Sequence, residues 1–166
     1  GGGDRLLREV TISLSREAMV LRGWDPAEAE SALVAALGDG SALEAWQRMV
    51  VAHGGDPDPD RLEKPIEAVE VAAAGDGFVV GCDGEALGRV AAAVGAGRRR
   101  VEEELAHGAG VLVHARIGDR VERGQPFATL LVGGRPIDRS KMVERIRDAF
   151  LIGPDTVAPP RLILGT

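Results

Sequence analysis

The chain has 166 residues, of which 45% are hydrophobic and 28% charged, as expected for a soluble globular protein. Its net charge of −6, from 20 basic and 26 acidic residues, argues against a nucleic-acid partner. No apolar run approaches the roughly 20 residues that a membrane helix needs. Cys82 is the sole cysteine, which excludes a disulfide within one chain and fits a cytoplasmic protein. Because the chain begins at Gly1 without a methionine or a secretory signal, we expect it to be a piece of a longer protein.

Residues 4–53 are predicted to form three helices, because apolar residues recur in them at helical spacing. Asp25-Pro26 gives the second helix an N-cap and a proline in its first turn, and Gly38 is expected to end it. Ser41 is expected to cap the third helix in a capping box. The apolar residues surround much of the first helix, which is typical of burial on several sides. We therefore expect this helical segment, 1–53, to be part of an incomplete α/β domain.

A proline- and glycine-rich linker is predicted at 54–65. Beyond it, short β-prone runs alternate with glycine-containing turns and with two predicted helices. Asp83 is expected to cap the first of these helices and Gly95 to end it. The second helix is expected over about 136–150, and a strand is expected near Leu162-Ile163-Leu164. The pattern indicates the α+β class, with a compact C-terminal domain over residues 66–166.

Four carboxylates in and after the linker match ligand positions of a calcium-binding loop: Asp56, Asp58, Asp60 and Glu67. Arg61 stands where such a loop needs glycine for a sharp turn, so an acidic, solvated linker is favoured over a calcium site. The three histidines lack the spacing of zinc ligands, and no metal site is predicted. The chain also lacks the Gly-x-Ser-x-Gly motif of serine hydrolases, and the residues by themselves indicate no catalytic group.

The segment Gly95-Ala96-Gly97 is followed by three arginines, Arg98, Arg99 and Arg100. Glycines allow backbone N–H groups to form an anion-binding concavity, and neighbouring guanidinium groups can clamp phosphate or carboxylate. The segment follows a helix, however, whereas known glycine-rich phosphate loops link a strand to a helix. Glutamates at 102–104 can pair with the arginines. The residues alone leave a functional loop and a solvated hairpin open.

An ordered set of motifs in the second half of the chain resembles one family. The set consists of Asp76-Gly77-Phe78-Val79, Leu87-Gly88, GAGRRR at 95–100, Gly108-Ala109-Gly110-Val111-Leu112 and IGDRVERGQPFATL at 117–130. In the first half, residues 4–23 and DGSALEAWQRMVVAHGGDP at 39–57 resemble the helices that precede this region. The family is that of the thymidine and pyrimidine-nucleoside phosphorylases. The chain resembles the C-terminal part of such an enzyme, beginning inside its large α/β domain.

The resemblance implies an α/β-hammerhead C-terminal domain, similar to a barrel sandwich. It also implies a parent enzyme, a homodimeric cytoplasmic pentosyltransferase, that cleaves thymidine with phosphate to thymine and 2-deoxyribose 1-phosphate. Phosphate is then a co-substrate, no cofactor is expected, and the expected partner is the N-terminal catalytic part of the same enzyme. The family's phosphate- and base-binding residues lie upstream, and neither Lys64 nor Lys141 matches them. No catalytic residue is therefore expected in this chain, which is predicted to be inactive alone.

Gly95, Gly97 and Arg98 match a glycine–arginine loop on the family's C-terminal domain. In these enzymes the large domain closes on a smaller helical one over the substrates. The resemblance therefore implies that the loop, with Arg99 and Arg100, helps to order a closed state that excludes water.

Two other functions fit parts of the sequence. The run IGDRVERGQPFATL also resembles segments of biotinyl and lipoyl carrier domains, but Lys141 is predicted on a helix rather than at the hairpin tip that a carrier needs. The main alternative is a stand-alone, non-catalytic binding or regulatory module that reuses this domain.

Overall fold

The computed structural model describes residues 3–98 and 100–164, and its internal contacts divide the chain into two units. The first comprises Gly1–Arg61 with Arg161–Thr166, and the second is Leu62–Pro160. The division falls inside the predicted linker, but it groups the final segment with the helical unit rather than with the C-terminal domain. The predicted domain limits stay a prediction. Within the described ranges, no helix has the length and apolar character needed to cross a membrane.

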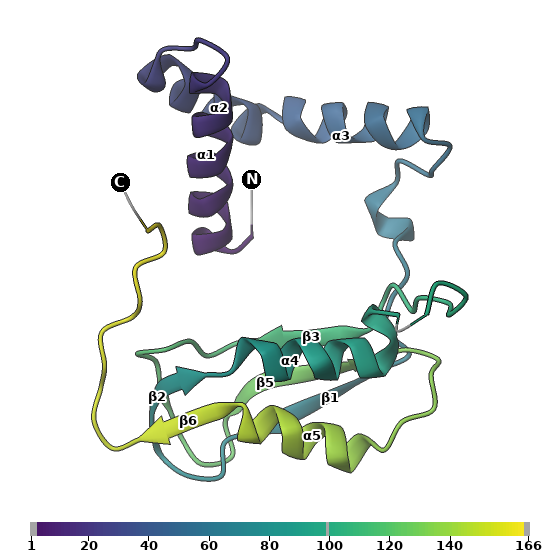
Figure 1. Cartoon of the computed structure of the whole chain (residues 1–166), viewed down its shortest axis with the longest axis vertical. Coiled ribbons are helices and arrows are strands. Elements are labelled where there is room, and N and C mark those ends of the chain that lie inside the picture. Colours follow the sequence, from purple (N-terminus) through teal and green to yellow (C-terminus); the bar gives the residue numbers. More distant parts are fainter. Residues whose placement is uncertain (1–2, 99, 165–166) are drawn as a thin grey trace. The chain divides into compact units, whose positions relative to one another are not determined.

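The first unit consists of the three predicted helices, α1 (Arg5–Val20), α2 (Pro26–Asp39) and α3 (Ser41–Ala52) (Figure 1). Asp4 caps α1 by accepting the N–H of Leu7 at 2.8 Å, and Asp25 caps α2 as predicted. Helix α2 contacts both α1 and α3. Ala29 is the one buried hydrophobic residue among those described in this unit, so the helices enclose very little core of their own.

The junction between α2 and α3 differs from the sequence prediction. Gly38 lies inside α2, which continues to Asp39 and ends at Gly40, whose φ of 90° suits a residue without a Cβ. Ser41 is the first residue of α3 rather than its cap, so the predicted capping box was wrong. Its N–H instead donates to the Asp39 carboxylate at 2.9 Å, which joins the two helices through a short turn.

The second unit contains two small antiparallel sheets (Figure 1). In one sheet the order is β1 (Glu67–Ala72), β5 (Pro126–Val132) and β3 (Gly110–Val113). In the other the order is β4 (Arg120–Val121), β2 (Gly77–Cys82) and β6 (Phe150–Gly153). The unit is thus of the predicted α+β, barrel-sandwich-like class without closing into a barrel.

One strand was placed wrongly by the sequence. Strand β6 follows directly after the last helix and pairs with β2, whereas the segment at 162–164 is not a strand in the described residues. Leu164 there is 83% exposed and has no neighbouring strand to pair with. Local apolar character was therefore insufficient, because a strand also needs a free sheet edge.

Helices α4 (Gly84–Ala91) and α5 (Arg139–Asp148) contact each other and the β1-β5-β3 sheet (Figure 1). Asp83 caps α4 as predicted, and the chain continues as a short π-helical turn, Ala92–Ala96, within which the predicted terminator Gly95 has a non-helical φ of 114°. Side chains from both sheets and both helices form one core. Its largest fully buried members are Leu130, Ile146, Val71, Val79, Val90, Val94 and Val121.

Candidate functional site

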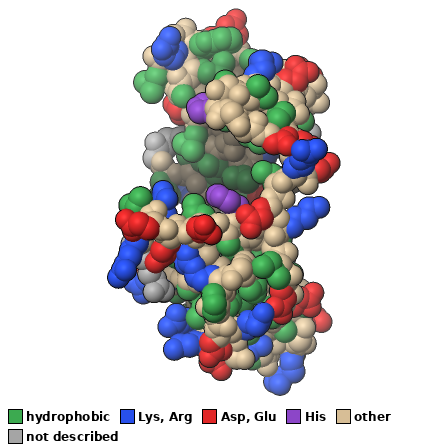
Figure 2. All heavy atoms as spheres, turned by 90° about the vertical axis from the view of Figure 1, so that its right-hand side faces the viewer, with side chains coloured by type: hydrophobic (Ala, Val, Ile, Leu, Met, Phe, Trp, Pro, Cys, Tyr) green, Lys and Arg blue, Asp and Glu red, His purple; other side chains and the backbone are tan. Residues whose placement is uncertain are grey.

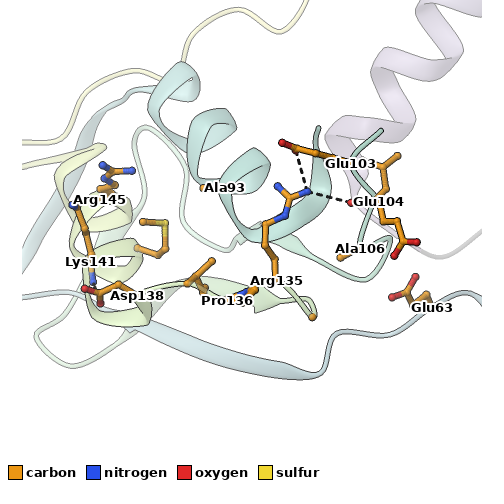
Figure 3. A pocket seen from close by; sticks show the side chains of 14 residues that line it. Glu63, Ala93, Glu103, Glu104, Ala106, Arg135, Pro136, Asp138, Lys141 and Arg145 are labelled. Atoms are coloured by element: carbon orange, nitrogen blue, oxygen red, sulfur yellow. Dashed lines mark hydrogen bonds and ion pairs between the residues drawn. The ribbon is translucent and has the colours of Figure 1, made fainter. Parts of the chain in front are cut away.

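An open groove of about 940 Å³ lies on the second unit, between α5 and the loop from Gly95 to Ala106 (Figure 3). The acidic side chains that line it are Glu63, Glu103, Glu104 and Asp138. The basic ones are Arg135, Lys141 and Arg145. The groove therefore has a lining of mixed charge. The loop contributes to it through residues 103–106, whereas the described residues of the predicted glycine–arginine segment at 95–100 do not line it.

The predicted segment occupies the first half of this loop. Gly95 is buried with a φ of 114°, and a Cβ there would lie 2.9 Å from that of Ala106, so glycine is required on two grounds. Gly97 is half-buried. Arg98 and Arg100 are both exposed, and Arg98 donates to the carbonyl oxygen of Val101 at 3.2 Å. Arg99 lies outside the described residues.

Arg135, which the sequence did not single out, contacts both ends of the loop. Its guanidinium donates to the carbonyl oxygens of Ala92 at 3.1 Å and Glu104 at 3.1 Å, with a longer contact to Gly97 at 3.4 Å. It also pairs with the Glu103 carboxylate at 3.4 Å (Figure 3). The sequence signal available beforehand was the Gly133-Gly134 pair, which marks a close backbone approach just before this arginine.

The return end of the loop is held against neighbouring backbone. The N–H of Ala106 donates to the Gly95 carbonyl at 2.9 Å, which closes the loop at its base. The N–H of His107 donates to Glu63 at 3.2 Å. Gly108 is buried so tightly that a Cβ on it would lie 2.4 Å from the carbonyl carbon of Lys64. The loop thus has a fixed base and an exposed tip.

Helix α5 supplies the opposite wall of the groove. Asp138 caps it by accepting the N–H of Lys141 at 3.1 Å, which places that lysine on a helix, as predicted. The side chains of Lys141 and Arg145 are exposed, and within the described part of the chain neither has an ion-pair partner. This wall can therefore attract an anionic group.

Two of the linker carboxylates that matched a calcium loop, Asp56 and Asp58, bond to neighbouring residues of the linker. Asp56 accepts the N–H of Asp58 at 3.0 Å and pairs with Arg61 at 2.9 Å. Asp58 in turn accepts the N–H of Asp60 at 3.0 Å. In residues 3–98 and 100–164, no three potential ligand side chains gather as a metal ion would require.

Comparison with known proteins connects this geometry to a family. Residues 78–153 match a family model described as the pyrimidine nucleoside phosphorylase C-terminal domain. The chain is 36% identical over 163 residues to the thymidine phosphorylase of Burkholderia orbicola, a match covering 94% of the chain and 37% of that protein. It is also 36% identical over 137 residues to the thymidine phosphorylase of Mycobacterium tuberculosis, covering 78% of the chain and 29% of that protein. The chain corresponds to the C-terminal portion of a pyrimidine nucleoside phosphorylase.

Proposed function

We propose that this chain is part of an enzyme that cleaves thymidine with phosphate. In that reaction the bond between C1′ and the base nitrogen breaks, a phosphate oxygen bonds to C1′, and the base leaves with the electron pair and takes up a proton. The observation that supports this proposal is the similarity to thymidine phosphorylases over 94% of the chain. The match spans 37% of the length of the Burkholderia orbicola enzyme. The chain is proposed to provide structural support and domain closure, while the catalytic residues lie in the remainder of the enzyme.

The exposed apolar side chains of the helical unit support a partner from the same enzyme. Leu7 is 66% exposed, Leu14 64% and Leu21 87%, and hydrophobic side chains of this unit reach the surface (Figure 2). Apolar surface of this kind is typical of an interface. The proposed partner is the N-terminal catalytic part, in a cytoplasmic homodimer that uses phosphate as co-substrate and needs no cofactor.

The loop is proposed to act in closure through its exposed arginines. Gly95 and Gly97 shape its first turn, and Arg98 and Arg100 reach solvent, where they are free to meet an acidic or phosphate group when domains close. An ordered closed state would exclude water from the reacting groups and so raise turnover.

A chimera tests the proposal directly. The matching 163-residue stretch of the Burkholderia orbicola thymidine phosphorylase is replaced by this chain, and phosphate-dependent release of thymine from thymidine is measured. We expect activity in the chimera and none in the 166-residue chain alone. A folded but inactive chimera would contradict the proposal and favour a stand-alone binding module.

The closure role is tested in the same chimera with R98A, which we expect to lower kcat. Arg89 offers a matched control, because it is an exposed arginine of the same unit that pairs with Glu85 on α4. R89A should leave kcat unchanged. Equal kcat values for R98A and the unmodified chimera would remove Arg98 from the closure mechanism.

A further inference from the structure

Arg135 donates to three backbone carbonyl oxygens in and just before the loop and pairs with one of its carboxylates. It follows β5, and its side chain extends toward Glu103 and Glu104 at the returning end of the loop (Figure 3). The carbonyl of Ala92 lies before Gly95, and that of Glu104 lies just before the return at Ala106. One guanidinium therefore connects the departing and the returning backbone of the same loop.

The chemistry of these contacts is specific for arginine. Its planar fork donates in several fixed directions, so Nη1 serves Ala92 while Nη2 serves Glu104 and the Glu103 carboxylate. A lysine ammonium would keep the charge but could not bridge these acceptors from one position. The Arg135 side chain is only 26% exposed, which strengthens charge-assisted hydrogen bonds relative to those on an open surface.

We infer that Arg135 is a positioning residue that fixes the base of the Gly95–Ala106 loop and so determines where Arg98 and Arg100 are presented. At the tip of the loop, by contrast, the side chains of Arg98 and Arg100 make a single hydrogen bond to described residues, the local bond from Arg98 to the Val101 carbonyl oxygen. The role of these arginines in domain closure rests on the proposed function. The anchoring of the loop by Arg135 does not depend on it.

Hydrogen exchange on the 166-residue chain tests the anchoring without any assay of activity. The reporter is the Ala106 amide, which is protected by its bond to Gly95, and the internal reference is the amides of β5. In R135Q and R135K we expect Ala106 to exchange about tenfold faster, because neither side chain can bridge the carbonyl oxygens of Ala92 and Glu104 as the guanidinium does. R139Q is the matched control, since it removes a neighbouring arginine that pairs with Glu67 at 2.7 Å. Unchanged exchange at Ala106 in both Arg135 variants, with β5 intact, would overturn the anchoring.

Kinetics in the chimera then separate positioning from general stability. We expect R135K to lower kcat about tenfold with a much smaller change in the KM for thymidine, and R139Q to change neither. If R135K exchanges and turns over like the wild type, charge alone suffices and the inference is wrong. If its exchange rises but kcat does not fall, the positioning role is overturned. An unmodified chimera without activity would refute the proposed function, while the exchange experiment would still decide the anchoring.

Discussion

Gly133 meets Ala106 so closely that a Cβ at residue 133 would lie 2.4 Å from the Cβ of Ala106. Gly133 follows directly after β5, and Ala106 is the residue at which the loop returns. The same added Cβ would also lie 3.1 Å from that of Ala109 and 3.3 Å from the Val94 carbonyl oxygen. The end of a central strand thus sets the position of the loop through direct backbone approach, two residues before Arg135.

We expect G133A to destabilise the second unit by about 1–3 kcal/mol, because the added methyl group must displace backbone-anchored neighbours. The quantity to measure is the free energy of opening from exchange of β5 amides, since Trp24 and Trp46 lie in the other unit and their fluorescence would not report on it. Gly134 offers the matched control. A Cβ there would meet only Ile66, at 3.8 Å, so G134A should cost far less.

A second substitution tests the cause of that loss. Replacing Ala106 by glycine in the G133A variant removes the closest of the predicted clashes, so the double variant should recover part of the lost free energy. The remaining contacts with Ala109 and Val94 should keep it below the wild type. Strictly additive losses would show that the Gly133–Ala106 approach is not the source of the effect.

Much of the fold was predictable because its signals are local. Aspartates before the helices, such as Asp25 and Asp83, indicated starts that the structure confirms. The error at Gly38 arose because two glycines lie near the end of α2, and only the backbone conformation at Gly40 distinguishes them. The strand at Phe150–Gly153 was missed because its pairing with β2 spans a long sequence separation.

The candidate site was predictable only in part. The glycines and arginines at 95–100 form a local motif that predicts a loop, and the structure places the described members in one loop. The sequence did not indicate Arg135, because its partners are mainly backbone carbonyl oxygens. Every residue has such an oxygen, so no sequence motif marks these partners. The contact therefore depends on the turn after β5 bringing residue 135 beside residues 92 and 104, which is a property of the fold.

The N-cap of α5 should contribute measurably to the stability of the groove wall. The Asp138 carboxylate accepts the N–H of Lys141 at 3.1 Å, so D138A should lower the free energy of unfolding of the second unit by about 1 kcal/mol. D138N keeps an oxygen acceptor at the same place and should cost clearly less. Exchange of the α5 and β5 amides measures both variants, and equal losses would show that the cap bond is not what stabilises the helix.

Asp39 should titrate at a lower pH than an ordinary aspartate. The backbone N–H of Ser41 is the largest cause of its lowered pKa, and the Ser41 side chain adds to the effect. Because the pKa is lower in the folded state, the bond stabilises the α2–α3 turn above the ordinary aspartate pKa. That stabilisation is lost as the pH falls through the folded value.

Carboxyl NMR titration of wild type and S41A measures this effect. S41A removes the hydroxyl but keeps the N–H, so the Asp39 pKa should rise only part of the way to its ordinary value. The other carboxyl groups serve as internal references and should not shift between the two proteins. If the Asp39 pKa returned fully to its ordinary value in S41A, the Ser41 side chain rather than the Ser41 backbone N–H would be the cause of the lowered pKa.

Cys82 should react slowly with alkylating reagents although it is exposed. Partial desolvation of the thiol is the largest cause of its raised pKa, and the neighbouring Asp83 carboxylate raises the pKa further, so little thiolate is present near neutral pH. D83N removes the charge and retains an oxygen that can cap α4. The rate of reaction with iodoacetamide at pH 8 should therefore rise, by less than about tenfold, because burial remains.

D138N makes the same chemical change at the other helix cap and should leave the rate unaltered. An equal rise in both variants would point to loosening of the helices, and no rise in D83N would exclude the charge of Asp83 as a cause.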